Sequence, residues 1–94
     1  MKPYRLLDRA EAELLDAAFY YQEQVQGLGS DFLDAVDKAF DEILEAPERW
    51  PVIGDEIRRH FVTRFPYSVL YRVDPEEIVI LAVAHHRRRP WYWK

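Results

Sequence analysis

The spacing of apolar residues changes once along this chain, and that change limits the folds that it can adopt. In the first half, apolar side chains recur at helical spacing, as at Ala10, Leu14, Ala17 and Tyr21. From Ile57 onward the period is two, and β-branched and aromatic residues are frequent. A chain with helices first and strands afterwards is expected to form an α+β fold.

Two helices are expected in the first half. Asp8 is a good N-cap for the first helix, and Gly27 and Gly29 end it because glycine readily adopts the left-handed conformation of a helix C-cap. Ser30 or Asp31 is expected to cap the second helix. The loop between them is too short for a strand, so the two helices form an antiparallel hairpin.

Three strands are expected in the second half, over residues 57–62, 67–73 and 78–85. The last of these is apolar on both faces, which indicates an interior position in the sheet. In the segment that leads to the strands, Trp50 is expected to cover an edge of the core.

Residues 3–7 are expected to add one more strand to the same sheet. The predicted order is therefore β-α-α-β-β-β, with the helical hairpin packed on a mainly antiparallel four-stranded sheet. At 94 residues, the chain is long enough for one domain, residues 1–94, and not for two.

The composition excludes several kinds of site. The chain has no cysteine, so it has no disulfide, cysteine metal site or cysteine nucleophile. No third ligand at metal-binding spacing and no phosphate-binding loop is recognised, so neither a metal nor a cofactor is expected. The longest apolar run, residues 78–84, is too short to cross a bilayer, and no signal peptide is recognised. A cytoplasmic protein with no membrane partner is therefore expected.

Charge is unevenly distributed along the sequence. The whole chain carries a net charge of −4, but residues 1–47 carry −7 and residues 57–94 carry +5. Ten of the 13 basic residues are arginine, which suits bidentate contacts to carboxylate or phosphate. The acidic residues of the helices, Glu13 among them, are expected to form a solvated face.

The C-terminal residues 85–94 are the most unusual part of the chain, because a run of arginines is followed there by a run of aromatic side chains. This pattern suits nucleic acid, where guanidinium groups bind phosphate and rings stack on bases. It equally suits an acidic protein partner, and it also suits a tail that folds back onto the domain. The candidate binding residues are Arg58, Arg59, Arg64, Arg72, Arg87, Arg88, Arg89, Trp91, Tyr92 and Trp93.

His85 and His86 end the last strand, where neighbouring side chains point to opposite faces. One of the two imidazoles is expected to pack against the rest of the protein. The other is a candidate general acid or base, since an unperturbed histidine titrates near neutral pH.

Three segments together carry a resemblance to a known family: APERWP, TRFPYSVLYRV and IVILAVAHHRRRPWYW. With the order of the elements, they resemble the RelE/ParE superfamily of toxins from bacterial type II toxin–antitoxin modules, above all its ParE-like, plasmid stabilisation branch. The resemblance covers essentially the whole chain. Its matching residues are the turn Arg64 to Tyr67, then Tyr71 and Arg72, and the closing His85, Arg87, Arg88, Pro90, Tyr92 and Trp93.

The resemblance implies a toxin that is neutralised by a cognate antitoxin, whose C-terminal segment lies over the toxin. A heterotetramer or a larger complex with the antitoxin is expected. An arginine-lined surface would attract such a segment if it carries acidic residues. Within the superfamily, ParE-like members inhibit DNA gyrase and carry no known chemistry, whereas RelE-like members cleave mRNA on the ribosome.

Gyrase inhibition is favoured over RNA cleavage for this chain. Tyr67 is followed by Ser68, where the nuclease branch has an arginine, and Arg59 and Phe61 stand near the positions of that branch's lysines. The acidity of the whole chain also fits poorly with a site lined by rRNA.

A ribosome-dependent mRNA endonuclease is the alternative, and whether the protein is an enzyme is left open. Tyr92 and Arg88 fall where the nuclease branch has a tyrosine and an arginine, and histidine-based members use a histidine near this position. The catalytic candidates would then be His85, His86, Arg88 and Tyr92. A non-toxic, degenerate interaction domain is the second alternative.

Overall fold

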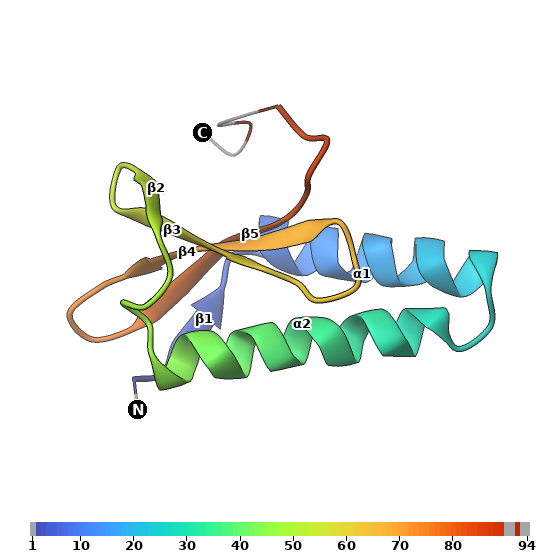
Figure 1. Ribbon diagram of the computed structural model, residues 1–94, viewed down its shortest axis with the longest axis horizontal. Helices are drawn as coiled ribbons and strands as arrows, with labels where there is room; N and C mark the ends of the chain where they lie inside the picture. The colour runs from blue at the N-terminus through green and yellow to red at the C-terminus, as the bar shows by residue number, and fades with distance from the viewer. Residues whose placement is uncertain (1, 90–91, 93–94) are drawn as a thin grey trace.

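The computed structural model describes residues 2–89 and residue 92, and Figure 1 shows the arrangement of their elements. Helices α1 (Asp8–Gln24) and α2 (Leu28–Glu45) form an antiparallel hairpin. The strands are β1 (Tyr4–Leu6), β2 (Val52–Gly54), β3 (Ile57–Phe61), β4 (Tyr67–Val73) and β5 (Ile78–His85). Within the described residues, neither helix is both long and apolar enough to span a membrane.

The five strands form one mixed sheet in the order β1-β5-β4-β3-β2. Strand β1 runs parallel to β5, and the other neighbouring strands pair antiparallel. The α+β class and the interior position of β5 are confirmed, but the predicted count of four strands is wrong. Residues 52–54 pair with β3 as an additional edge strand, and three residues are too few to show a period of two in the sequence.

Strand β5 lies between β1 and β4, and seven of its eight residues are buried. Its register shifts once, because Leu70 of β4 pairs with Ala82 and the next residue, Tyr71, pairs with Ile80. The extra residue, Leu81, is a β-bulge, so it and Ala82 both pack on the same face of the sheet.

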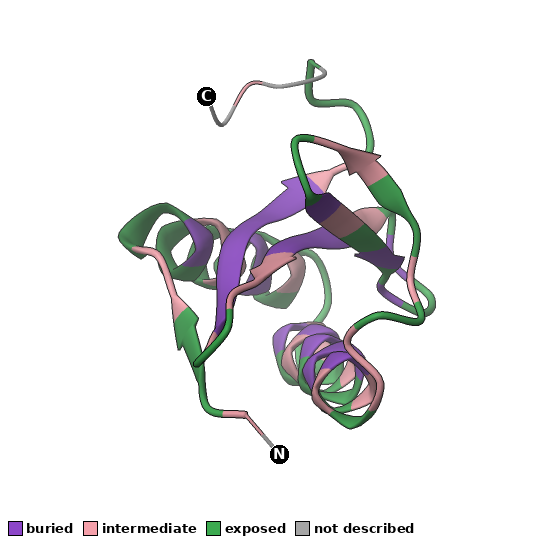
Figure 2. Cartoon of the chain, turned by 90° about the vertical axis from the view of Figure 1, so that its left-hand side faces the viewer, coloured by how far each residue is buried: buried purple, intermediate pink, exposed green. Residues whose placement is uncertain are grey.

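The sheet separates two apolar clusters, and Figure 2 shows the buried strands between them. The larger cluster lies under the helices, with Phe32, Val36 and Ile43 of α2 fully buried in it. The smaller cluster lies on the other face, called the second face from here on. Ile53 and Tyr92 pack against the buried residues of this face. A free second face would expose the apolar side chains of β4 and β5 to water.

The loop between the helices differs from the expectation. Helix α2 begins at Leu28, so neither Ser30 nor Asp31 is its cap. Gly27 occupies the N-cap position with a φ of 90°, and the side-chain oxygen of Gln22 accepts hydrogen bonds from the N–H groups of Gly27 and Gly29. A glutamine of α1 thus supplies the cap that was expected from α2.

The cap of α1 was also predicted wrongly. Asp8 is the first residue of this helix, Leu7 stands at its N-cap, and no side chain forms a cap hydrogen bond there. The carboxylate of Asp8 lies in the first turn, where it stabilises the positive end of the helix dipole.

Trp50 covers an edge of the larger cluster, as expected. Its ring stacks on the imidazole of His60, with 3.7 Å between the ring centroids. His60 Nε2 in turn forms a hydrogen bond of 3.0 Å with Glu42 of α2. The segment before the sheet is thereby fixed to both layers of the fold.

Gly29 is required by the close approach of the two helices. A Cβ at this position would lie 2.7 Å from the backbone oxygen of Ala18. We expect Gly29→Ala to lower the free energy of unfolding by about 1–3 kcal/mol, although alanine favours helix, because the helices must move apart. Urea denaturation measures this value. The exposed neighbour provides a control, since Ser30→Ala should change stability by less than about 0.5 kcal/mol. Equal stability of Gly29→Ala and the wild type would contradict the packing argument.

Candidate functional site

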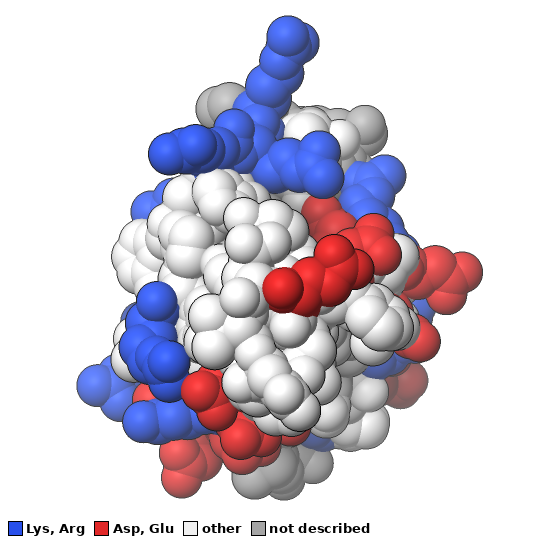
Figure 3. Space-filling model, turned by 90° about the vertical axis from the view of Figure 1, so that its right-hand side faces the viewer, with Lys and Arg blue, Asp and Glu red and all other residues white. Residues whose placement is uncertain are grey.

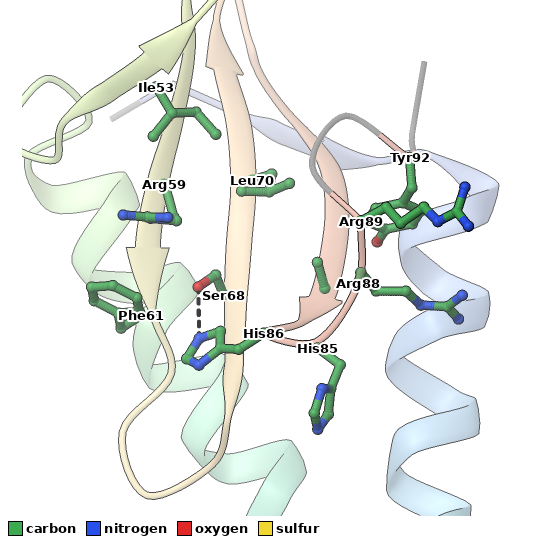
Figure 4. Close-up of a pocket in the computed structure, with 11 residues that line it drawn as sticks. Ile53, Arg59, Phe61, Ser68, Leu70, His85, His86, Arg88, Arg89 and Tyr92 are labelled. Atoms are coloured by element: carbon green, nitrogen blue, oxygen red, sulfur yellow. Dashed lines mark hydrogen bonds between the residues drawn. The ribbon is translucent and has the colours of Figure 1, made fainter.

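A pocket of about 370 Å³ lies on the second face of the sheet, beside the start of the C-terminal segment (Figure 4). Arg59 and Phe61 reach it from β3, and Ser68 and Leu70 reach it from β4, because every second residue of a strand faces the same side. We call it the arginine pocket. Its lining residues are Ile53, Arg59, Phe61, Ser68, Leu70, Ala84, His85, His86, Arg88, Arg89 and Tyr92.

Three arginines give the pocket positive charge. Within the described part of the chain, Arg59, Arg88 and Arg89 form no ion pair. The guanidinium carbon of Arg59 lies 4.9 Å from the ring centroid of Phe61, a cation–π contact that leaves its positive charge unneutralised. Figure 3 shows basic side chains gathered at the end of the molecule where the C-terminal segment lies. An acidic chain therefore carries a positively charged patch at this end of the molecule.

Other predicted binding arginines have structural partners outside the pocket. Arg58 Nη1 donates to the carbonyl oxygens of Glu48 and Trp50 at 2.9 and 2.7 Å. Arg72 forms a bidentate pair with Asp74, with distances of 2.7 and 3.0 Å.

Two more of the predicted arginines lie elsewhere on the surface. Arg64 lies in the turn before β4, with a φ of 78°, and its Nη1 is 3.6 Å from Asp31. Arg87 is exposed, and it is not among the residues that line the pocket. Two further predicted binding residues, Trp91 and Trp93, lie outside the described residues.

The two histidines at the end of β5 point away from each other in Figure 4, as expected for neighbours at a strand end. His86 Nε2 forms a hydrogen bond of 2.9 Å with the hydroxyl of the buried Ser68. His85 packs against the ring of Tyr67, with 5.0 Å between the centroids. Burial, followed by the positive charge of Arg87, lowers the pKa of His85. This imidazole is therefore neutral near pH 7.

Tyr92 brings the C-terminal segment back onto the sheet. Its hydroxyl donates a hydrogen bond to the carboxylate of Glu13, and the guanidinium of Arg88 lies 5.3 Å from the centroid of its ring. Burial, and then the bond to Glu13, raises the pKa of Tyr92, so the phenol stays protonated. The expectation that Glu13 is a solvated surface acid is wrong, because its other oxygen accepts the N–H of Val83 at 3.1 Å.

Six residues at this site are not among the predicted site residues: Ile53, Phe61, Ser68, Leu70, Ala84 and Glu13. Ser68 and Leu70 follow the alternation of β4, so the period of two could have placed them opposite Arg59 and Phe61. Placing Ile53 at the site requires the additional strand β2, and placing Glu13 there requires the packing of α1 on β5. Among the described residues, no three histidine or carboxylate side chains lie together as a metal site.

Comparison with known proteins identifies the family. The chain matches the model of the ParE toxin of type II toxin–antitoxin systems (parDE) over residues 4–90. The proteins named Toxin ParE2 of two Mycobacterium tuberculosis strains, CDC 1551/Oshkosh and ATCC 25618/H37Rv, are 33% identical to it over 90 residues, which are 92% of this chain and 83% of theirs. The chain therefore belongs to the ParE family of type II toxin–antitoxin toxins, as the sequence resemblance implied.

The fold is also shared with a solved structure. A structure titled "Chromosomal ParDE TA system from P. aeruginosa" matches with a TM-score of 0.68 over 90% of this chain and 96% of that one. The sequence identity is 21%, so this likeness concerns the fold.

The lowered pKa of His85 predicts how stability depends on pH. Below about pH 6.5 the unfolded chain binds the proton of this histidine more tightly than the folded chain does, which favours unfolding. We expect the stability difference between wild type and His85→Gln to rise as pH increases to about 6.5, and to stay constant above about 7. Denaturation of both proteins across this pH range measures the difference in stability. Both proteins have the same carboxylates, so the pH dependence that these groups cause cancels in the difference. A difference that does not change with pH would contradict the burial of His85.

Proposed function

We propose that this ParE-family protein is a cytoplasmic toxin that inhibits DNA gyrase by binding it through the arginine pocket. The observation that carries the proposal is the family match over residues 4–90. ParE-like members of the superfamily act on gyrase, as the resemblance in the sequence implies. A binding mechanism requires an exposed surface with anchoring side chains and needs no catalytic residue.

The composition of the arginine pocket supports a protein target. Its inner surface is apolar at Ile53, Leu70 and Ala84, while the guanidinium groups of Arg59 and Arg88 carry positive charge at the pocket. Protein interfaces combine an apolar centre with arginine and aromatic anchors in this way. Acidic side chains of the target would pair with the arginines that have no ion pair among the described residues.

The state of Tyr92 argues against RNA cleavage with this residue as the base. Cleavage through a 2′-hydroxyl needs a group that accepts its proton. The Tyr92 hydroxyl already donates to Glu13, and its raised pKa keeps it protonated at neutral pH.

His85 supports the second candidate function, a ribosome-dependent mRNA endonuclease. Its pKa is lowered, so the imidazole is neutral near pH 7, with its Nδ1 accepting the N–H of Arg87 at 3.0 Å, and Arg88 lines the same pocket and would stabilise a phosphorane. The neutral imidazole beside a cation is the observation that favours this alternative.

Neutralisation by an antitoxin follows from the family. We propose that an acidic segment of the antitoxin is drawn to the basic surface, because opposite charges speed the encounter of two proteins. A heterotetramer or a larger complex is the proposed form of the assembly.

A supercoiling assay with purified DNA gyrase tests the main proposal. We expect the wild-type toxin to inhibit supercoiling, and Arg59→Ala or Arg88→Ala to raise the concentration for half inhibition about tenfold, because each variant removes an interface anchor. Arg5→Ala is the matched control, since Arg5 is bound to Glu77 at the opposite edge of the sheet. Normal supercoiling at saturating wild-type toxin would contradict gyrase inhibition.

Induced expression in cells separates the remaining alternatives. Growth arrest with intact transcripts is expected for a gyrase inhibitor. Cut transcripts that disappear with His85→Ala would instead indicate the endonuclease. Unchanged growth would indicate a non-toxic interaction domain.

A further inference from the structure

We infer that Glu13 of α1 is a positioning residue that holds the C-terminal wall of the arginine pocket in place through Tyr92. Glu13 does not line this pocket. It lies in a smaller cavity of about 180 Å³ between α1 and the end of β5, which Arg88 also lines. The inference concerns the same site as the proposed function and rests on that function only for its binding measurement.

The position of Glu13 is fixed by the edge of strand β5. Strand β1 ends at Leu6, which pairs with Ile80, so β5 continues beyond its parallel neighbour. In this part of β5, the N–H of Val83 donates a hydrogen bond of 3.1 Å to the carboxylate of Glu13. A backbone N–H at a sheet edge requires such a partner when it is shielded from water.

The second oxygen of Glu13 is thereby presented to Tyr92. The first bond already restricts the side chain, so less conformational entropy is lost when the Tyr92 hydroxyl binds. Both partners are donors, and a carboxylate is the side chain that offers them two acceptor oxygens. A glutamine would offer one oxygen.

Among the described residues, this contact is the side-chain hydrogen bond that joins the C-terminal segment to helix α1. The N–H of His86 donates to the carbonyl of Pro66, but the next backbone bonds, from Arg88 to His85 and from Tyr92 to Arg89, stay within the segment. Among the described residues, no other side-chain hydrogen bond links the chain beyond His86 to the helices.

Tyr92 connects this attachment with the arginine pocket, because Tyr92 also lines that pocket. Its ring packs on the apolar cluster of the second face and lies under the guanidinium of Arg88. If the ring is displaced, Arg88 loses its support and the pocket loses one wall. Glu13 thus controls the shape of a binding surface that it does not itself touch.

A double-mutant cycle on binding to purified DNA gyrase tests the inference. We expect Tyr92→Phe and Glu13→Ala each to weaken binding about tenfold, because each removes a hydrogen bond to a charged group. If Glu13 acts through Tyr92, adding Tyr92→Phe to Glu13→Ala should cause little further loss. Glu11→Ala, an exposed acid on the same helix, is the matched control and should bind like the wild type. Additive losses would overturn the inference.

Hydrogen exchange of the free toxin provides a measurement that does not depend on gyrase. We expect the amides of residues 86–89 to exchange about tenfold faster in Tyr92→Phe and in Glu13→Ala than in the wild type. Unchanged exchange in both variants would overturn the inference even if gyrase binds. Conversely, faster exchange with no gyrase binding by the wild type would support the role of Glu13 and contradict the proposed function.

Denaturation of the same variants separates positioning from general stability. Glu13→Ala also removes the acceptor of Val83 and should lower the free energy of unfolding, whereas Tyr92→Phe leaves that bond intact. Faster exchange at residues 86–89 in Tyr92→Phe, with wild-type exchange in β4 and β5, is the signature expected of a positioning contact. Equal acceleration throughout the sheet would instead indicate a purely structural role.

Discussion

Strand β5 is apolar on both faces, and the rest of the structure follows from the need to cover it. The helical hairpin covers one face and supplies most of the hydrophobic core. The second face carries a smaller buried cluster, against which Ile53 and Tyr92 pack. An uncovered apolar strand would cost roughly 25 cal/mol for each Å² left in water. Covering this apolar face therefore stabilises the sheet and also brings the end of the chain back to it.

This return also creates the candidate functional site. Arg88 and Arg89 lie shortly before Tyr92 in the sequence, so covering the second face places them beside the pocket formed by β3 and β4. Elsewhere in the protein, Arg5 and Arg72 are paired with neighbouring carboxylates. The net charge of −4 therefore describes the molecule poorly, because the described residues offer Arg88 and Arg89 no ion-pair partner, whereas Arg5 and Arg72 have one.

Sequence periodicity predicted the regular elements well and their ends less well. The limits of β4 and β5 agree with the prediction, since both strands are long enough to show a clear pattern. The helix caps did not follow the local residue types, because Gln22 reaches across the loop to bind Gly27 and Gly29. The composition of the C-terminal segment correctly directed attention to Arg88, Arg89 and Tyr92, but it also included arginines that the structure uses for its own turns and loops.

The sequence by itself determined the fold class, the uneven distribution of charge and the likeness to ParE toxins, because each of these depends on local pattern. Only the tertiary structure decided which arginines have an ion-pair partner within the described part of the chain and which acid contacts Tyr92. Glu13 and Tyr92 lie 79 positions apart, and no local pattern relates residues at that distance. Their contact exists because α1 packs on the uncovered edge of β5, and such packing is a property of the whole fold.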